Sequence, residues 1–133
     1  MKAKSAKKVT KPASKKKPAN KLLPLIVAAL GAKKAEDLRV LDVSKLSSIT
    51  DFLILGSGNS EPHLRALRIE VERILDKQKA KILGVDTTKS SGWVVVDAFE
   101  VMVHLFTPEN RDKYRIESLW KDAAEIDLSA WTK

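Results

Sequence analysis

Gly56 and Ser57 are the residues best placed to do chemistry, because they stand between a predicted strand and a predicted helix. In enzymes that transfer nucleotidyl groups, backbone amides and a serine hydroxyl at such a position hold the triphosphate. The reaction also needs two carboxylates at alternate positions of a nearby strand, because only residues i and i+2 project from one face and can hold Mg²⁺ between them. Neither Asp86 nor Asp97 has a second acid two residues away. We therefore predict that the protein is not an enzyme.

The remaining motifs and reactive side chains do not assemble into a site either. The stretch Gly56–Gly58 fails the P-loop and dinucleotide-binding templates, because no Lys-Ser or Lys-Thr follows and Glu61 stands in place of the third glycine. His63 falls in the first turn of a predicted helix, and His104 falls on a strand without the serine that a catalytic triad needs. The chain has no cysteine, which excludes disulfides, thiolate nucleophiles and cysteine-bound metals. We expect no cofactor and no metal.

The net charge of +8 is concentrated in an N-terminal tail, residues 1–21. Nine of the 25 lysines and arginines lie in this tail, which has no acid, so residues 22–133 hold 16 basic and 17 acidic side chains. A domain near neutrality lacks the one-sided basic composition of a phosphate-binding surface. The tail has Val9 as its only branched aliphatic residue and cannot bury enough apolar surface to order itself. We predict a disordered basic tail.

Three roles remain open for the tail. It can be a solubilising extension without a partner, or it can bind RNA phosphates in a salt-dependent way. A mitochondrial transit peptide, the third role, is normally rich in arginine, which the tail lacks. The longest apolar run of the chain, Leu22–Leu30, contains Pro24 and is less than half the ~20 residues that span a bilayer. We expect no membrane span, and a cytoplasmic location.

Hydrophobic periodicity and turn residues predict eight elements in a domain of residues 22–127, followed by a short C-terminal tail of residues 128–133. In chain order they are a helix from Pro24 to Lys34, strands Leu38–Val43 and Asp51–Ser57, a helix capped by Ser60 and ending near Lys79, strands Lys81–Val85, Trp93–Asp97 and Val101–Phe106, and a helix that starts at Thr107 and Pro108 and contains Tyr114, Leu119 and Trp120. This order predicts one α/β (α+β) domain with a mixed sheet of about five strands and helices packed on it.

The last two strands, Trp93–Asp97 and Val101–Phe106, predict a hairpin because only three residues separate them. A two-residue turn at Ala98-Phe99 would place Trp93 opposite His104. Register matters here, because a slip of one residue turns every side chain to the other face of the sheet.

The two faces of this hairpin differ in composition. One is entirely aliphatic and predicts core: Val94, Val96, Val101, Val103 and Leu105. The other mixes aromatic, apolar and charged groups, as recognition surfaces do: Trp93, Val95, Asp97, Glu100, Met102 and His104. The alternative, in which Trp93 belongs to the core and His104 is only hydrogen-bonded, stays open at this point.

Short motifs distributed over most of the domain resemble those of one known family. They are Leu41-Asp42-Val43, Thr50-Asp51, Gly58 with Ser60, Trp93 with Asp97, Val103-His104, Arg111 with Tyr114, and Glu117 with Leu119-Trp120. In order and spacing they resemble the ribosomal silencing factor family, also called the RsfS or Iojap family. The resemblance runs from about Leu25 to Ala123 and leaves the basic tail outside it.

The resemblance implies a nucleotidyltransferase-like α/β domain without the catalytic acids. It also implies docking on a large-subunit ribosomal protein, universal protein fourteen, at the intersubunit face. A domain bound there would keep the small subunit from joining and so repress translation when nutrients are short. The basic tail would add electrostatic contact with rRNA. We expect the protein to be a monomer or a weak homodimer that binds no membrane.

The residues expected to form or support the docking surface are Trp93, Asp97, Met102, His104, Phe106, Tyr114 and Trp120. Of these, only the first four are expected to contact the partner directly, because packing of the final helix on the sheet explains Tyr114 and Trp120 equally well. The sequence departs from the family at Phe99, where relatives usually carry glycine, and at Asp86-Thr87, where they commonly carry Glu-Gly. Two other functions remain as alternatives: a degenerate nucleotidyltransferase that uses Gly56 and Ser57, and an RNA-binding protein driven by its tail.

Overall fold

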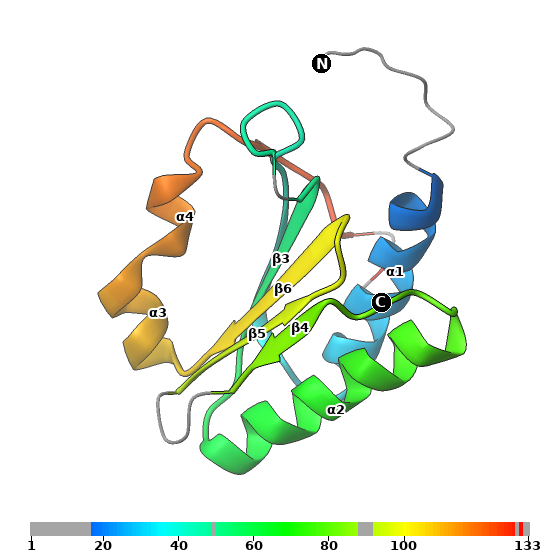
Figure 1. The fold of residues 1–133 in the computed structure, drawn as a ribbon. Helices are drawn as coiled ribbons and strands as arrows, with labels where there is room; N and C mark the ends of the chain where they lie inside the picture. The colour runs from blue at the N-terminus through cyan, green and yellow to red at the C-terminus, as the bar shows by residue number, and fades with distance from the viewer. Residues whose placement is uncertain (1–16, 49, 88–91, 130, 132–133) are drawn as a thin grey trace.

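A six-stranded mixed sheet carries helices on both of its faces (Figure 1). The structure is a computed structural model and describes residues 17–48, 50–87, 92–129 and 131. The strands are β2 (Glu36–Asp42), β3 (Phe52–Ser57), β4 (Gly84–Asp86), β5 (Trp93–Asp97), β6 (Val101–Phe106) and β7 (Ala124–Glu125). The helices are α1 (Lys17–Ala32), α2 (Glu61–Lys77), α3 (Pro108–Tyr114) and α4 (Ile116–Leu119).

The strands lie in the order β4-β5-β6-β3-β2-β7, in which β3 and β6 run parallel and the other neighbours run antiparallel. The predicted mixed α/β domain is confirmed, and β7 adds a strand that the sequence pattern does not predict. Strand β4 is shorter than predicted and begins at Gly84 rather than Lys81. No helix within the described residues is long and apolar enough to cross a membrane.

The first core lies between the sheet and helices α1 and α2. Its buried members include Ile26, Leu30, Val40, Ile54, Leu67, Val71, Leu75, Val96 and Val103. The helical spacing of the α2 members is the signal that predicts this helix, and Ser60 caps it by accepting a hydrogen bond from the His63 amide at 3.2 Å. Leu128 and Trp131, in the segment predicted as a C-terminal tail, also pack on this core.

The second core lies on the opposite face of the sheet, beneath α4. Its buried members are Leu41, Val43, Leu53, Leu55, Phe106 and Ile116. Trp93, Met102, Trp120 and Ala123 pack against it and are partly buried. Figure 1 shows α3 and α4 on this side and α1 and α2 on the other.

Helix α1 begins at Lys17, so the predicted start at Pro24 is wrong. Proline fits the first turn of a helix, but inside a helix it removes one hydrogen bond and strains the preceding turn. Here Leu22 and Leu23, just before the proline, are buried in the first core. Their packing stabilises the helical turn that precedes Pro24. The backbone of residues 17–21, assigned to the tail by composition, is therefore helical, while residues 1–16 lie outside the described part of the chain.

The final helix is divided in two, so the prediction of one helix after Thr107 is wrong. Arg115 adopts a left-handed conformation with φ 50°, which ends α3 and starts α4. Arginine is common in helix interiors, so its residue type gives no sign of the break. The predicted cap is present, because the Thr107 hydroxyl accepts a hydrogen bond from the Asn110 amide.

The hairpin register differs from the predicted one by two residues. Trp93 lies opposite Phe106, and His104 lies opposite Val95. The two turn residues are Phe99 and Glu100 rather than Ala98 and Phe99, because the amide of Ala98 donates to the carbonyl of Val101 at 2.9 Å. A shift of two residues keeps each side chain on its predicted face, since strand side chains alternate with a period of two.

The predicted division into an aliphatic face and a mixed face therefore holds. All five aliphatic residues, Val94, Val96, Val101, Val103 and Leu105, are buried in the first core. The positive φ of Phe99, 73°, explains the turn: the Glu100 amide donates back to the Ala98 carbonyl at 2.9 Å and closes a γ-turn around Phe99.

Candidate docking surface

Four rings gather where the β5–β6 hairpin meets α3, and we call Trp93, His104, Phe106 and Tyr114 the aromatic cluster. The Trp93 ring centroid is 4.7 Å from that of Tyr114, 5.6 Å from Phe106 and 6.0 Å from His104. These separations are typical of favourable aromatic pairs. Trp93 is thus the centre of the cluster, with one neighbour on α3 and two on β6.

A hydrogen bond within the cluster orients Trp93. Its indole Nε1 donates to Nδ1 of His104 at 3.2 Å. His104 is buried, and this burial lowers the pKa of the imidazole from 6.5 to about 4. The ring is therefore neutral at pH 7, which leaves Nδ1 free to accept the indole proton.

The structure combines the two interpretations that the sequence left open for Trp93 and His104. Trp93 is half-buried and packs beside the second core, whereas His104 is buried and hydrogen-bonded. Phe106, which the sequence places on the same face, is completely buried. His104 and Phe106 therefore lie beneath Trp93 as its support, and only Trp93 and Tyr114 of the cluster present substantial surface.

Asp97 and Met102 are opposite each other at the turn end of the hairpin. Both are half-buried. One carboxylate oxygen of Asp97 accepts a hydrogen bond from the Phe99 amide at 3.0 Å, which helps to hold the strained turn. Met102 packs against the second core. These two residues extend the half-buried face from Trp93 toward the turn.

Tyr114 and Trp120 lie at the ends of the two short helices, on the face of the sheet that carries the second core. Tyr114, the last residue of α3, is 43% exposed, and the Lys113 ammonium lies 5.4 Å from its ring centroid. Trp120, just after α4, is partly buried against the second core. Tyr114 is more accessible than any of the four residues expected to contact a partner directly, so its exposure makes it a fifth contact candidate.

Several exposed apolar residues are missing from the predicted set. Leu119 on α4 is 72% exposed and Phe99 at the hairpin turn is 62% exposed. Leu83 and Val85, beside and within β4, are also exposed. The signal that could have identified Phe99 and Leu119 is the presence of a large apolar side chain at a turn and on a short helix, where the described part of the chain leaves it exposed.

The chain matches the family model described as "Ribosomal silencing factor during starvation" over residues 16–133. This match spans almost the whole sequence. The chain belongs to the ribosomal silencing factor family.

Curated and solved relatives agree with this assignment. A ribosomal silencing factor of Halalkalibacterium halodurans is 35% identical over 107 residues, which cover 80% of this chain and 92% of that protein. A mouse protein named "Mitochondrial assembly of ribosomal large subunit protein 1" is 28% identical over 74% of this chain and 44% of its own length. A crystal structure of a Chromobacterium violaceum protein superposes with a TM-score of 0.74 at 36% identity and covers 77% of this chain and 85% of that one.

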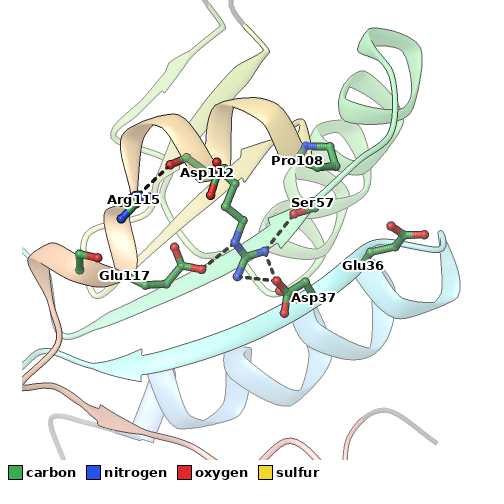
Figure 2. A pocket seen from close by; sticks show the side chains of 9 residues that line it. Glu36, Asp37, Ser57, Pro108, Asp112, Arg115 and Glu117 are labelled. Atoms are coloured by element: carbon green, nitrogen blue, oxygen red, sulfur yellow. Dashed lines mark hydrogen bonds and ion pairs between the residues drawn. The ribbon is translucent and has the colours of Figure 1, made fainter.

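The Gly56-Ser57 pair of this family member is not arranged to hold a triphosphate. Gly56 lies within β3, which pairs with β2 on one side and β6 on the other. The Ser57 side chain is buried, and its hydroxyl already accepts a hydrogen bond from Nη1 of Arg111 at 3.0 Å (Figure 2). Among the described residues, no three His, Cys, Asp or Glu side chains gather in a way that could hold a metal ion. Ribosomal silencing factors are not a class of enzyme.

Proposed function

We propose that this protein docks on the large ribosomal subunit through Trp93, Tyr114 and the half-buried residues beside them, and that it thereby blocks joining of the small subunit. The observation that carries the proposal is the aromatic cluster. An indole held by a hydrogen bond to a buried histidine and packed against an exposed tyrosine forms a rigid, partly desolvated anchor, and such anchors dominate protein interfaces.

Family membership supports a ribosomal target, and the name of the mouse relative connects that protein with the large subunit. The resemblance of the sequence motifs narrows the target to universal protein fourteen at the intersubunit face. A domain bound at that face inhibits by occupying space, so it needs no catalytic acids. Asp97 and Met102 would lie at the rim of the contact, and His104, Phe106 and Trp120 would support it from beneath.

The degenerate nucleotidyltransferase is the weaker alternative. Its triphosphate would need the Gly56 amide and the Ser57 hydroxyl, but Gly56 lies inside β3 opposite Leu105 of β6, and the Ser57 side chain is buried against Arg111. Nucleotide binding measured with and without Mg²⁺ separates the two functions, because the docking protein should show none.

The proposal is tested by mixing separated ribosomal subunits with and without the purified protein and comparing the gradient profiles. We expect free subunits to increase at the expense of joined ribosomes. A Trp93→Ala variant should lose this effect. Ile69→Ala is the control, because Ile69 is an apolar side chain, 51% exposed, on α2 at the other face of the sheet. An unchanged fraction of joined ribosomes at saturating protein would refute the proposal.

A further inference from the structure

Arg111 on α3 connects four segments of the chain although it is almost completely buried, with 6% of its surface exposed. Its Nη1 donates to the backbone carbonyl of Asp37 at 2.7 Å and to the hydroxyl of Ser57 at 3.0 Å. Its Nε donates to a carboxylate oxygen of Glu117 at 2.7 Å. Figure 2 shows these bonds converging from Asp37, Ser57 and Glu117. One guanidinium thus joins α3 to β2, β3 and α4.

An irregularity in β2 supplies the first of these partners. The pairing of β2 with β3 shifts between Glu36 and Arg39, so that one extra residue is accommodated on β2. Asp37 lies within this bulge with φ 52°, a left-handed conformation that aspartate tolerates better than most residues. The bulge leaves the Asp37 carbonyl free of the ladder to β3, and Arg111 uses it.

The break between α3 and α4 supplies the last partner. On an uninterrupted helix, side chains three or four positions apart are neighbours, whereas residues six apart, such as Arg111 and Glu117, point in different directions. The left-handed conformation of Arg115 turns the chain so that Glu117 comes within 2.7 Å of Arg111. Burial alone raises the pKa of Glu117, but the hydrogen bond and charge of Arg111 outweigh it and hold this pKa below its usual value. Glu117 is therefore ionised at pH 7.

The cavity beside Arg111, about 490 Å³, does not suit an anionic ligand. The charged residues that line it are Glu36, Asp37, Asp112 and Glu117, which are acidic, and Arg111 and Arg115, which are basic. Acids are in excess, and Nη2 of Arg111 is buried without a hydrogen-bond partner and lies 3.7 Å from the Asp37 carboxylate. The guanidinium faces the protein rather than an incoming anion, so its bonds serve the fold.

We infer that Arg111 is a positioning residue for docking: by fixing α3 and α4 on the ends of β2 and β3, it sets the place of Tyr114 against Trp93. Tyr114 follows Arg111 by one turn on α3, and Trp120 follows Glu117 by one turn at the end of α4. The Trp93–Tyr114 contact of 4.7 Å therefore depends on the orientation of a helix that Arg111 holds. The inference rests on the proposed function, because it assigns Arg111 to the same docking surface.

The test compares Arg111→Met, Arg111→Lys and Glu117→Gln with the control Arg73→Met in the full-length protein. Arg73 forms an exposed ion pair with Glu70 on α2, and such pairs contribute little to stability. Each variant is measured for hydrogen exchange in the free protein and for affinity toward separated large subunits, corrected for the folded fraction. The lysine variant keeps the charge, but its single ammonium cannot reach all three partners at once.

We expect faster exchange in residues 108–119 of the Arg111→Met and Arg111→Lys proteins while residues 61–77 stay protected, because openings can be confined to one part of a structure. Affinity for large subunits should fall about tenfold, within the usual size of an energetic coupling between two sites. Glu117→Gln leaves the other bonds of Arg111 in place. It should therefore accelerate exchange in residues 108–119 and weaken binding to large subunits, but less than the Arg111 variants do. Arg73→Met should change affinity less than about twofold.

Two results have separate meanings. If exchange accelerates equally in α2 and α3 while the folded variants bind large subunits as the unaltered protein does, Arg111 acts on global stability alone and the inference is overturned. If the unaltered protein does not bind large subunits, the proposed function fails, and exchange in residues 108–119 still shows whether Arg111 holds the two helices.

Discussion

Trp93 and His104 are joined across the hairpin on the diagonal rather than face to face. Trp93 pairs with Phe106 and His104 pairs with Val95, yet the indole Nε1 reaches His104 Nδ1 at 3.2 Å. Diagonal neighbours on one face of an antiparallel pair lie within reach of aromatic side chains. The bond exists only while His104 is neutral, because a protonated imidazole has no acceptor to offer.

This dependence predicts that stability falls when the pH is lowered below neutrality. The unfolded chain binds a proton on His104 below its usual pKa of 6.5, whereas the folded protein does so only near 4. Between these values the unfolded state binds more protons, so the free energy of unfolding decreases as the pH falls through this window. From pH 7 to pH 5 the loss should be about 2 kcal/mol.

Thermal melting at pH 7 and pH 5 measures this loss. His104→Gln should remove most of the pH dependence, whereas His63→Gln, at the start of α2, should leave it in place. A His104→Gln protein that still loses stability between pH 7 and pH 5 would show that another group is responsible.

The alternation of side chains on the hairpin is the part of the site that the sequence predicts well. Aliphatic residues stand at alternate positions of both strands, as at Val94, Val96 and Val103, and this alternation identifies the buried face. A register shift of two residues leaves each side chain on the same face, so the assignment is correct although the predicted register is not. The register itself was beyond prediction from local pattern, because the turn places Phe99 at φ 73°, a conformation for which phenylalanine has no preference.

The long-range features of the fold had no local signal either. Arg115 ends α3 in a left-handed conformation that its residue type does not favour, and Asp37 forms a bulge inside an ordinary strand pattern. Arg111 bonds to residues on both sides of these irregularities, to the Asp37 carbonyl 74 positions away in the sequence and to Glu117 beyond the break at Arg115. Tertiary contacts of this kind override local propensity. The hydrogen bonds of Arg111 with Asp37, Ser57 and Glu117 could therefore be found only from the structure.

Trp93 and Val103 provide a paired test of the two hairpin faces. Trp93→Ala should abolish docking and cost about 1–3 kcal/mol of stability, because the ring is half-buried and its loss leaves the His104 acceptor without its donor. Trp93→Phe keeps an aromatic ring but loses the Nε1–H donor to His104, and it should cost about 1 kcal/mol. Val103→Ala should cost about 1–3 kcal/mol of stability while the folded protein binds normally. Melting curves and binding to large subunits measure both effects, and normal docking by the Trp93→Ala protein would contradict the assignment.

Phe99 should lower stability in its present turn. A positive φ at a residue with a side chain costs about 1–2 kcal/mol, and glycine relieves that cost against a loss of about 0.5–1 kcal/mol from its own flexibility. Phe99→Gly should therefore raise the free energy of unfolding by about 0.5 kcal/mol, whereas Phe99→Ala, which keeps the strain, should not. Denaturant unfolding compares the two variants, and equal midpoints would show that the turn is not strained.

The basic tail should increase affinity for the ribosome without selecting the site. Residues 1–16 contain seven lysines, and exposed charges are screened beyond ~10 Å at 0.1 M salt. Removing these residues, or changing their lysines to serine, should weaken binding at low salt and matter much less at high salt. Loss of the preference for large subunits in either variant would make the tail the recognition element.

The most direct test of the docking proposal is sedimentation of the purified protein with separated ribosomal subunits. The protein should sediment with large subunits and remain in the supernatant with small ones, Ile69→Ala should behave in the same way, and Trp93→Ala should remain in the supernatant with both. Equal sedimentation with the two subunits, or undiminished sedimentation of the Trp93→Ala protein with large subunits, would contradict docking through the aromatic cluster.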